Sequence, residues 1–78
     1  MSITVRYFAS LRDQAGCDSE QVLTQGDAAA LYEALRARHG FSLPRERLRI
    51  ARNGEFAGWD ATLVDGDEIV FIPPVSGG

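Results

Sequence analysis

Apolar and polar side chains alternate at the beginning of the chain. Ile3, Val5 and Tyr7 occupy every second position, and this period of two predicts a first strand. Residues 20–24 show a weaker pattern of the same kind, which predicts a second strand that forms a hairpin with the first. One side of this hairpin is therefore expected to face a core.

A short helical turn is predicted between these two strands. Ser10 and Asp13 have the spacing of an N-terminal capping box, with Asp in place of the usual Glu. Gly16 follows at the position where the turn should end, because glycine adopts the left-handed conformation without steric cost.

One long helix is predicted for the middle of the chain. Asp27 is a typical N-cap residue, the helix runs to His39, and Gly40 stands where glycine commonly ends helices. Apolar positions that recur at helical spacing predict the face that packs on the sheet: Ala28, Leu31, Ala34 and Leu35.

Three more strands are predicted in the second half of the chain. Two segments, 48–52 and 55–57, flank Asn53-Gly54, a dipeptide typical of two-residue hairpin turns. A largely apolar run follows at 68–72, which is typical of a strand in the middle of a sheet. Two prolines come directly after it and end the strand, because proline donates no backbone hydrogen bond.

This order of elements predicts an α+β domain of two layers. One main helix covers only one face of a mixed sheet of four to five strands. If the last strand is central, its natural neighbour is the first strand, parallel to it, and that arrangement is the β-grasp, or ubiquitin-like, fold. We therefore expect a β-grasp domain over residues 1–72, followed by an extended, flexible tail over residues 73–78.

Composition excludes several classes of function. The chain has 78 residues and a net charge of −3, so it is one domain without the basic character of most nucleic-acid-binding proteins. It has no signal-peptide pattern and no apolar run of the roughly 20 residues that span a membrane. Cys17 is the single cysteine, which excludes an internal disulfide and a multi-cysteine zinc site. We expect a cytoplasmic protein without a metal site.

The basic residues are all arginine, so no side chain carries an amine that could accept an acyl group. Four of them lie close together, and four acidic residues follow. The favoured interpretation is a solvated sheet edge, and the alternative is a charge split that steers a charged partner. The residues are Arg45, Arg47, Arg49 and Arg52, then Asp60, Asp65, Asp67 and Glu68.

The end of the sequence carries the most specific motif. Residues 63–78 read Leu-Val-Asp-Gly-Asp-Glu-Ile-Val-Phe-Ile-Pro-Pro-Val-Ser-Gly-Gly. This segment resembles the ending of molybdopterin synthase small subunits, and residues 5–12 are similar to the same family. Glycine has no Cβ, so a tip made of Gly77 and Gly78 also fits a channel too narrow for other residues.

The resemblance implies a sulfur carrier, which is not an enzyme on its own. In this family an adenylyltransferase resembling ubiquitin-activating enzymes uses ATP to adenylate the terminal carboxylate, and sulfur from a donor protein converts it to a thiocarboxylate. The large synthase subunit, in an expected heterotetramer, takes the tail and builds the molybdopterin dithiolene from cyclic pyranopterin monophosphate. For this chain, the resemblance implies that Gly78 is adenylated and becomes thioglycine and that Gly77 is the small residue before it. It also implies that no cofactor is bound stably.

A partner surface is predicted on the sheet face away from the helix. Strand alternation turns Phe8 and Ile72 to this face as one exposed apolar patch, which Phe56 joins. The resemblance implies that this face and the tail dock with the activating enzyme and the large subunit. The predicted partner-binding residues are Phe8, Phe56, Ile72, Pro73, Pro74, Val75 and Ser76.

Alternative functions remain open at this point. The chain could carry sulfur on Gly78 for thiamine or cysteine synthesis, or it could be a ubiquitin-like modifier that is joined through Gly78 to lysines of other proteins. A β-grasp binding module with incidental glycines is a third hypothesis. Among the other residues, Cys17 is expected to be a turn residue, His39 to close the helix and favour its dipole, and Trp59 to be a packing anchor.

Overall fold

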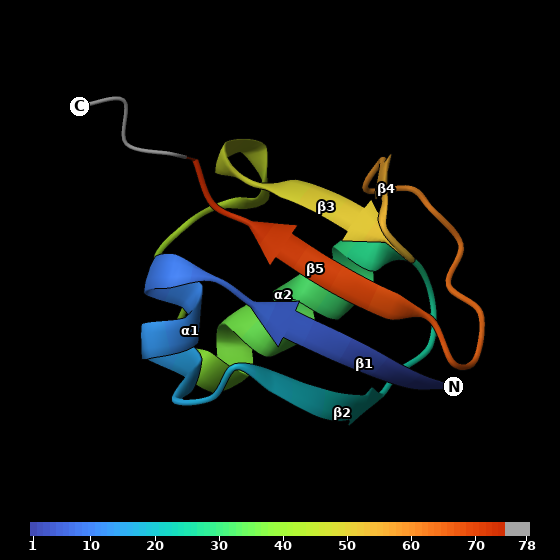
Figure 1. Cartoon of the computed structure of the whole chain (residues 1–78), viewed down its shortest axis with the longest axis horizontal. Coiled ribbons are helices and arrows are strands. Elements are labelled where there is room, and N and C mark those ends of the chain that lie inside the picture. The colour runs from blue at the N-terminus through green and yellow to red at the C-terminus, as the bar shows by residue number, and fades with distance from the viewer. Residues whose placement is uncertain (75–78) are drawn as a thin grey trace.

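Five strands form one mixed sheet in the computed structural model, which describes residues 1–74 (Figure 1). The strands are β1 Ser2–Tyr7, β2 Ser19–Leu23, β3 Arg49–Arg52, β4 Glu55–Ala57 and β5 Glu68–Ile72, in the order β2-β1-β5-β3-β4. β1 and β5 are parallel, with Val5 opposite Ile69, and the other neighbouring strands are antiparallel. The predicted β-grasp fold, with a central last strand parallel to the first, is confirmed.

The long helix α2, Ala28–His39, lies across one face of this sheet (Figure 1). Asp27 caps its first turn, and the Asp27 carboxylate accepts a hydrogen bond of 2.9 Å from the backbone N–H of Ala30. Gly40 ends the helix in the left-handed conformation, with φ of 72°, and its N–H donates to the carbonyl of Arg36. Both predicted helix ends are confirmed.

The short helix α1, Ala9–Ala15, differs from the prediction at its start. It begins directly after Phe8, whose carbonyl accepts a hydrogen bond from the N–H of Leu11, and no side chain caps it. The capping box predicted from Ser10 is therefore wrong, because Ser10 lies inside the first turn. Leu11 is fully buried, so packing against the core positions this helix in place of a local cap. Gly16 ends it in the left-handed conformation, as predicted.

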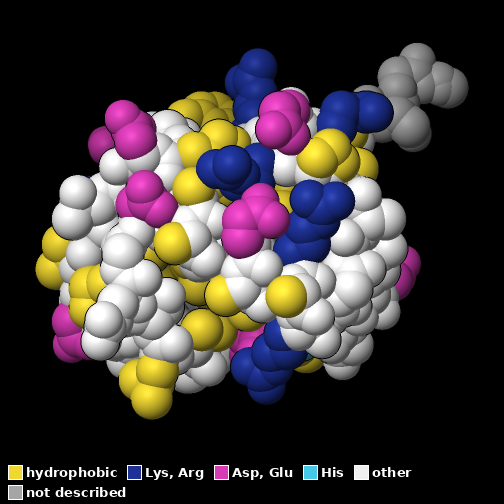
Figure 2. Space-filling view, turned by 180° about the vertical axis from the view of Figure 1, so that it is seen from behind, with side chains coloured by type: hydrophobic (Ala, Val, Ile, Leu, Met, Phe, Trp, Pro, Cys, Tyr) yellow, Lys and Arg dark blue, Asp and Glu magenta, His cyan; other side chains and the backbone are white. Residues whose placement is uncertain are grey.

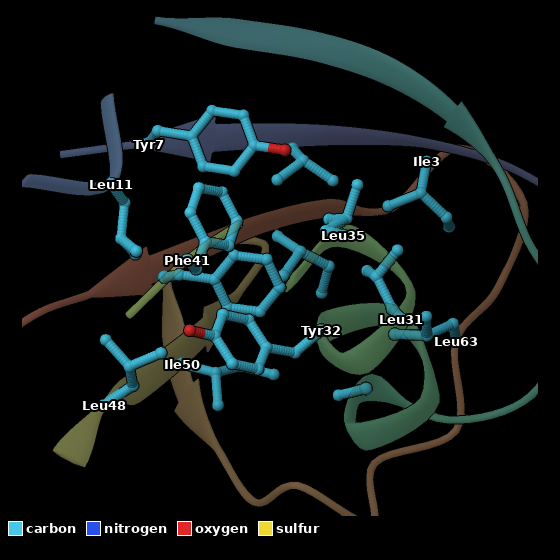
Figure 3. Packing of buried hydrophobic residues seen from close by; sticks show 14 residues of the cluster. Ile3, Tyr7, Leu11, Leu31, Tyr32, Leu35, Phe41, Leu48, Ile50 and Leu63 are labelled. Atoms are coloured by element: carbon cyan, nitrogen blue, oxygen red, sulfur yellow. The ribbon is translucent and has the colours of Figure 1, made fainter. Parts of the chain in front are cut away.

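The core lies between the sheet and α2 (Figure 3). On the helix itself, Ala34 is exposed, contrary to the prediction, and Tyr32 fills the core instead. The Tyr32 hydroxyl donates to the carbonyl of Leu43, which satisfies the polar end of this buried ring. Trp59 stacks on Phe71 with ring centroids 5.9 Å apart, which confirms it as a packing anchor. The helix-facing residues of β1 and β5 are buried as predicted: Ile3, Val5, Tyr7, Ile69 and Phe71.

Two connections lead into and out of β3. After Pro44, one 3-10 turn, η1 (Arg45–Arg47), precedes the strand. Asn53 and Gly54 then join β3 to β4 with φ of 52° and 87°, the two positive values that a type I′ hairpin turn requires. The hairpin prediction is confirmed. No helix within residues 1–74 has the length and apolar character needed to cross a membrane.

Candidate functional site

The chain leaves the middle of the sheet at the carboxyl end of β5 (Figure 1). Because β5 is parallel to β1, its end lies beside the end of β1, and on the other side Ile72 lies opposite Arg49 at the start of β3. Pro73 follows half-buried and Pro74 exposed. The root of the predicted tail therefore lies between two neighbouring strands. Four predicted site residues lie outside the described residues: Val75, Ser76, Gly77 and Gly78.

The sheet face away from α2 carries a short apolar row. Phe56 on β4 lies opposite Ala51 on β3, and Ala51 lies opposite Val70 on β5. Phe56 is 71 % exposed. Ile72 lies two residues after Val70, so it faces the same side of the sheet. Ala51 and Val70 thus connect Phe56 with Ile72. Neither was predicted to lie on this face, although the alternation of side chains along β3 and β5 indicates it for both.

Phe8 lies on the same face beside the end of β5, because Tyr7 before it lies opposite Phe71. It is 51 % exposed, follows β1 directly, and lines a shallow hollow together with Arg6 and Arg12. Arg6 lies opposite Val70 on the neighbouring strand, and its guanidinium pairs with Glu68 at 3.0 Å. The face therefore combines aromatic side chains with charged ones, because strand alternation turns Arg6 and Arg49 to the same side. The prediction that Ile72 is exposed is wrong, because its neighbours half-bury it.

A groove of about 450 Å³ lies at the root of the tail. Arg49 borders it and extends toward β4, where its guanidinium carbon lies 5.6 Å from the centroid of the Phe56 ring, within the range of a cation–π contact. Arg49 thus joins the groove to the exposed aromatic residue, a role that residue type alone does not indicate. The main lining residues of the groove are Arg47, Arg49, Ile72, Pro73 and Pro74.

A second cluster surrounds Asp67, at the opposite end of β5. Its carboxylate accepts hydrogen bonds from the Arg52 guanidinium at 2.7 Å, the Asn53 side-chain amide at 2.9 Å and the Val64 N–H at 2.8 Å. The bond from Arg52 is the main cause that holds the pKa of Asp67 at about 2, against the opposing effect of burial. The predicted solvated sheet edge is wrong for this pair, because Asp67 is only 5 % exposed. The cluster ties the loop before β5 to the β3–β4 hairpin.

Glu20 connects β2 to the end of α2. One of its oxygens accepts a hydrogen bond of 2.7 Å from the Tyr7 hydroxyl and lies 2.7 Å from Nε2 of His39, and the other lies 3.5 Å from Arg38. Burial raises the pKa of Glu20, but the hydrogen bonds from Tyr7 and His39 outweigh it and lower the pKa below its usual value. Burial, followed by the bond to Glu20, raises the pKa of Tyr7 far above its usual value. His39 therefore closes the helix, as predicted, and also fastens it to the sheet.

The described residues form a surface for contacts and the start of the predicted tail. Within residues 1–74, no group of three or more His, Cys, Asp and Glu side chains is placed to hold a metal ion. Cys17 is half-buried in the turn after Gly16, the place expected of a turn residue. The groove is shallow and the aromatic rings are exposed. Such a surface is suited to contact with another protein, whereas a small molecule is usually enclosed in a deeper pocket.

The chain is similar to known proteins over nearly its whole length. The model of the ThiS family matches residues 5–78. The molybdopterin synthase sulfur carrier subunit of Escherichia coli is 35 % identical over 80 residues, which cover 97 % of this chain and 99 % of the relative. Small archaeal modifier protein 1 of Haloferax volcanii is 32 % identical over 84 residues, which cover 94 % of this chain and 97 % of the relative.

Solved structures share the fold over its full length. The crystal structure of SAMP1 from Haloferax volcanii has a TM-score of 0.83 at 30 % identity and covers 100 % of both chains. Subunits 1 and 2 of the molybdopterin-converting factor from Helicobacter pylori form a solved complex, in which the matching chain has a TM-score of 0.71 at 26 % identity and 100 % coverage of both chains. The resemblance inferred from the chain's ending is thus confirmed, and with a family match that extends from residue 5 to residue 78, this chain belongs to the ThiS family.

Proposed function

We propose that this chain is the sulfur carrier subunit of a molybdopterin synthase. The observation that carries the proposal is the similarity of the whole chain to sulfur carrier subunits of that enzyme, in a family match that includes Gly77 and Gly78. The fold agrees with this role, because a groove lies at the root of the tail and Arg49, which borders it, contacts the exposed ring of Phe56. The chain donates sulfur and is not a complete enzyme by itself.

The proposed chemistry takes place at the carboxyl group of Gly78. An adenylyltransferase joins this carboxylate to AMP from ATP and releases pyrophosphate, which turns a poor electrophile into a good one. Sulfide-level sulfur from a donor protein then attacks the acyl carbon and displaces AMP, which leaves a thiocarboxylate. Each chain has one such carboxyl group, so a dithiolene with two sulfur atoms requires two loaded carriers. In each transfer the sulfur bonds to the substrate, and water then cleaves its bond to the acyl carbon of Gly78 and returns the carboxylate.

The remaining groups for this reaction come from partner proteins. The large subunit of the synthase receives the tail, in a heterotetramer, and holds cyclic pyranopterin monophosphate while the sulfur is transferred. Gly77 lets the tail enter a narrow channel, since any side chain there would add a Cβ. ATP and the covalent sulfur are bound only transiently, and the cytoplasm is the compartment in which we expect these steps.

The test changes the last two residues of the full chain. Deletion of Gly78, or addition of one residue after it, should abolish sulfur transfer in a reconstituted synthase without changing the melting temperature, because the sheet ends at Ile72. Intact mass after incubation with the adenylyltransferase, ATP and a sulfur donor should show one oxygen replaced by sulfur in the unaltered chain only. Gly77→Val should block transfer, and Gly77→Ala, which adds one carbon, serves as the graded control. Full activity of the Gly78 deletion would contradict the proposal.

A second candidate function is protein modification through Gly78. It is favoured by the similarity to the Haloferax volcanii modifier, in sequence and in structure. Because all basic side chains of this chain are arginine, a copy of the chain offers no side-chain amine to another copy, so copies could not be linked to one another through their side chains. Incubation of the activated chain with a lysine-rich acceptor protein separates the two functions: an isopeptide bond indicates a modifier, and an unmodified acceptor with a thiocarboxylate at Gly78 indicates a sulfur carrier. Carriers for thiamine or cysteine synthesis would form the thiocarboxylate but fail with the large subunit.

A further inference from the structure

Two arginines differ from the other six in their surroundings. Within residues 1–74, six of the eight arginines pair with a carboxylate: Arg6, Arg12, Arg36, Arg38, Arg45 and Arg52. Arg47 and Arg49 have no such partner among those residues, and both are exposed. On the helix side of the molecule, dark blue and magenta side chains lie interspersed (Figure 2). The unpaired arginines are therefore a local feature of one part of the surface.

Arg47 and Arg49 border the same groove, at the root of the tail. Arg47 is the last residue of η1, and Arg49 is the first residue of β3, directly opposite Ile72. Leu48 between them is buried, so its packing holds the backbone of this segment in place and leaves both neighbours at the surface. Among the described residues that line the groove, Glu46 is acidic and Arg47 and Arg49 are basic, so this part of the lining has a net positive charge.

The guanidinium of Arg49 is also held in position. It lies over the ring of Phe56, 5.6 Å from the centroid. A planar guanidinium on an aromatic ring still has its N–H groups free at the edges, where they bind a carboxylate in two-point fashion. This contact favours one placement of the guanidinium, so less conformational entropy is lost when a partner binds it there.

We propose that Arg47 and Arg49 dock acidic side chains at the mouth of the channel in which the large synthase subunit receives the tail. This inference rests on the proposed function. Four residues follow Pro74, and fully extended they reach about 13 Å. A protein that encloses Gly78 must therefore lie close to the groove from which the tail departs.

Charge gives this docking a direction. The tip of the tail is a carboxylate or thiocarboxylate, so the inner end of the channel must be electropositive to hold it. Acidic side chains at the rim, facing Arg47 and Arg49, give the outer end the opposite sign. The two charge pairs then favour entry with the tail first and disfavour other orientations, because like charges would meet in them.

The experiment measures association of the full chain with the large subunit. Arg47→Gln/Arg49→Gln should lower the association rate constant about tenfold at low salt and differ little from the unaltered chain at about 0.5 M salt, where surface charges are screened. Arg47→Lys/Arg49→Lys keeps both charges and should retain most of the association rate. The melting temperature should stay unchanged, because both side chains are exposed.

The matched control removes the same charge from the opposite layer. Arg36→Gln/Arg38→Gln lies on α2 and should leave the association rate nearly unchanged. Equal losses in both double variants would show that only net charge matters and would overturn the inference, as would an unchanged rate in Arg47→Gln/Arg49→Gln. A loss seen with the adenylyltransferase but not with the large subunit would also overturn it. If the unaltered chain fails to bind the large subunit at all, the proposed function fails instead.

Discussion

Asp67 and Arg49 both belong to the charge-rich second half of the chain, and the structure gives them opposite surroundings. Asp67 is 5 % exposed and accepts hydrogen bonds from two side chains and one backbone N–H. Arg49 is exposed and contacts an aromatic ring. A buried carboxylate destabilises a fold unless donors surround it, whereas an exposed guanidinium keeps its hydration. At the residue scale, Asp67 therefore serves stability and Arg49 remains available to a partner.

The first prediction concerns Asp67→Asn. The substitution leaves the half-buried Arg52 without its counter-ion, so we expect a loss of roughly 1–3 kcal/mol in the free energy of unfolding at neutral pH. Urea denaturation measures it. Asp60→Asn, an exposed carboxylate, is the control and should change stability by less than about 0.5 kcal/mol. Equal stability of Asp67→Asn and the unaltered chain would contradict this role.

The same variant predicts a pH dependence. The folded state lowers the pKa of Asp67 from 3.8 to about 2, so the carboxylate stabilises the fold when it is ionised. This contribution is present above the ordinary pKa and is lost as the pH falls from about 4 toward 2. The stability difference between the unaltered chain and Asp67→Asn should therefore be constant near neutral pH and shrink over that acidic range. A difference that stays constant down to pH 2 would show that the charge of Asp67 is not the cause.

At the scale of the elements, α2 depends on its cap. The Asp27 carboxylate binds the N–H of Ala30, one of the donors that the first helical turn leaves without a partner. Asp27→Ala should cost about 0.5–2 kcal/mol in the free energy of unfolding, measured by thermal or urea denaturation. Asp13→Ala changes an exposed carboxylate on α1 and is the matched control. An equal loss in both variants would show that general charge, and not capping, is responsible.

The two faces of the sheet should respond oppositely to truncation. Leu35 is 2 % exposed, so Leu35→Ala should cost roughly 2–5 kcal/mol of stability. Phe8→Ala and Phe56→Ala remove exposed rings and should cost about 0.5 kcal/mol or less, but they should weaken binding to the large subunit more than about tenfold. Thermal melts and titration of each variant measure the two effects. A collapsed melting temperature with unchanged affinity for Phe56→Ala would mean that this face is part of the core.

Ile72 requires a separate interpretation in such experiments. The structure half-buries it, between the groove and the strand neighbours of β5. Its truncation should therefore reduce stability and affinity together, and only Phe8 and Phe56 report on docking alone.

At the scale of the whole molecule, the strand order predicts which parts open first. β5 is hydrogen-bonded on both sides, to β1 and β3, whereas β4 has three residues and pairs only with β3. Amide hydrogen exchange followed by mass spectrometry should therefore be at least about tenfold slower in β5 than in β4. Leu35→Ala should speed exchange in β5, because strands in the middle of a sheet open by global unfolding. Equal exchange in β4 and β5 would contradict this order of stability.

Most elements could be predicted because their signals are local. Asp27 and Gly40 mark the ends of α2, and Asn53-Gly54 marks the hairpin, since caps and tight turns depend on neighbouring residues in the chain. The capping box at Ser10 failed because the burial of Leu11, a contact with distant residues, sets the start of α1. The prediction for Ala34 was also wrong, because periodicity along the helix does not show how much of the helix surface the sheet covers.

The strand periodicity, the capped helix and the family of this chain depend on residue type and spacing, so they could be predicted from the sequence alone. Which charges are matched became visible in the folded chain. Asp67 and Arg52 pair across 15 positions of the chain, and Arg6 and Glu68 pair across 62. The parallel pairing of β1 with β5 brings the first and last strands side by side in one sheet, and the antiparallel pairing of β3 with β5 places Arg49 beside the tail root. An ion pair requires two side chains that are close in space, and the spacing of residues along the chain does not show which ones are.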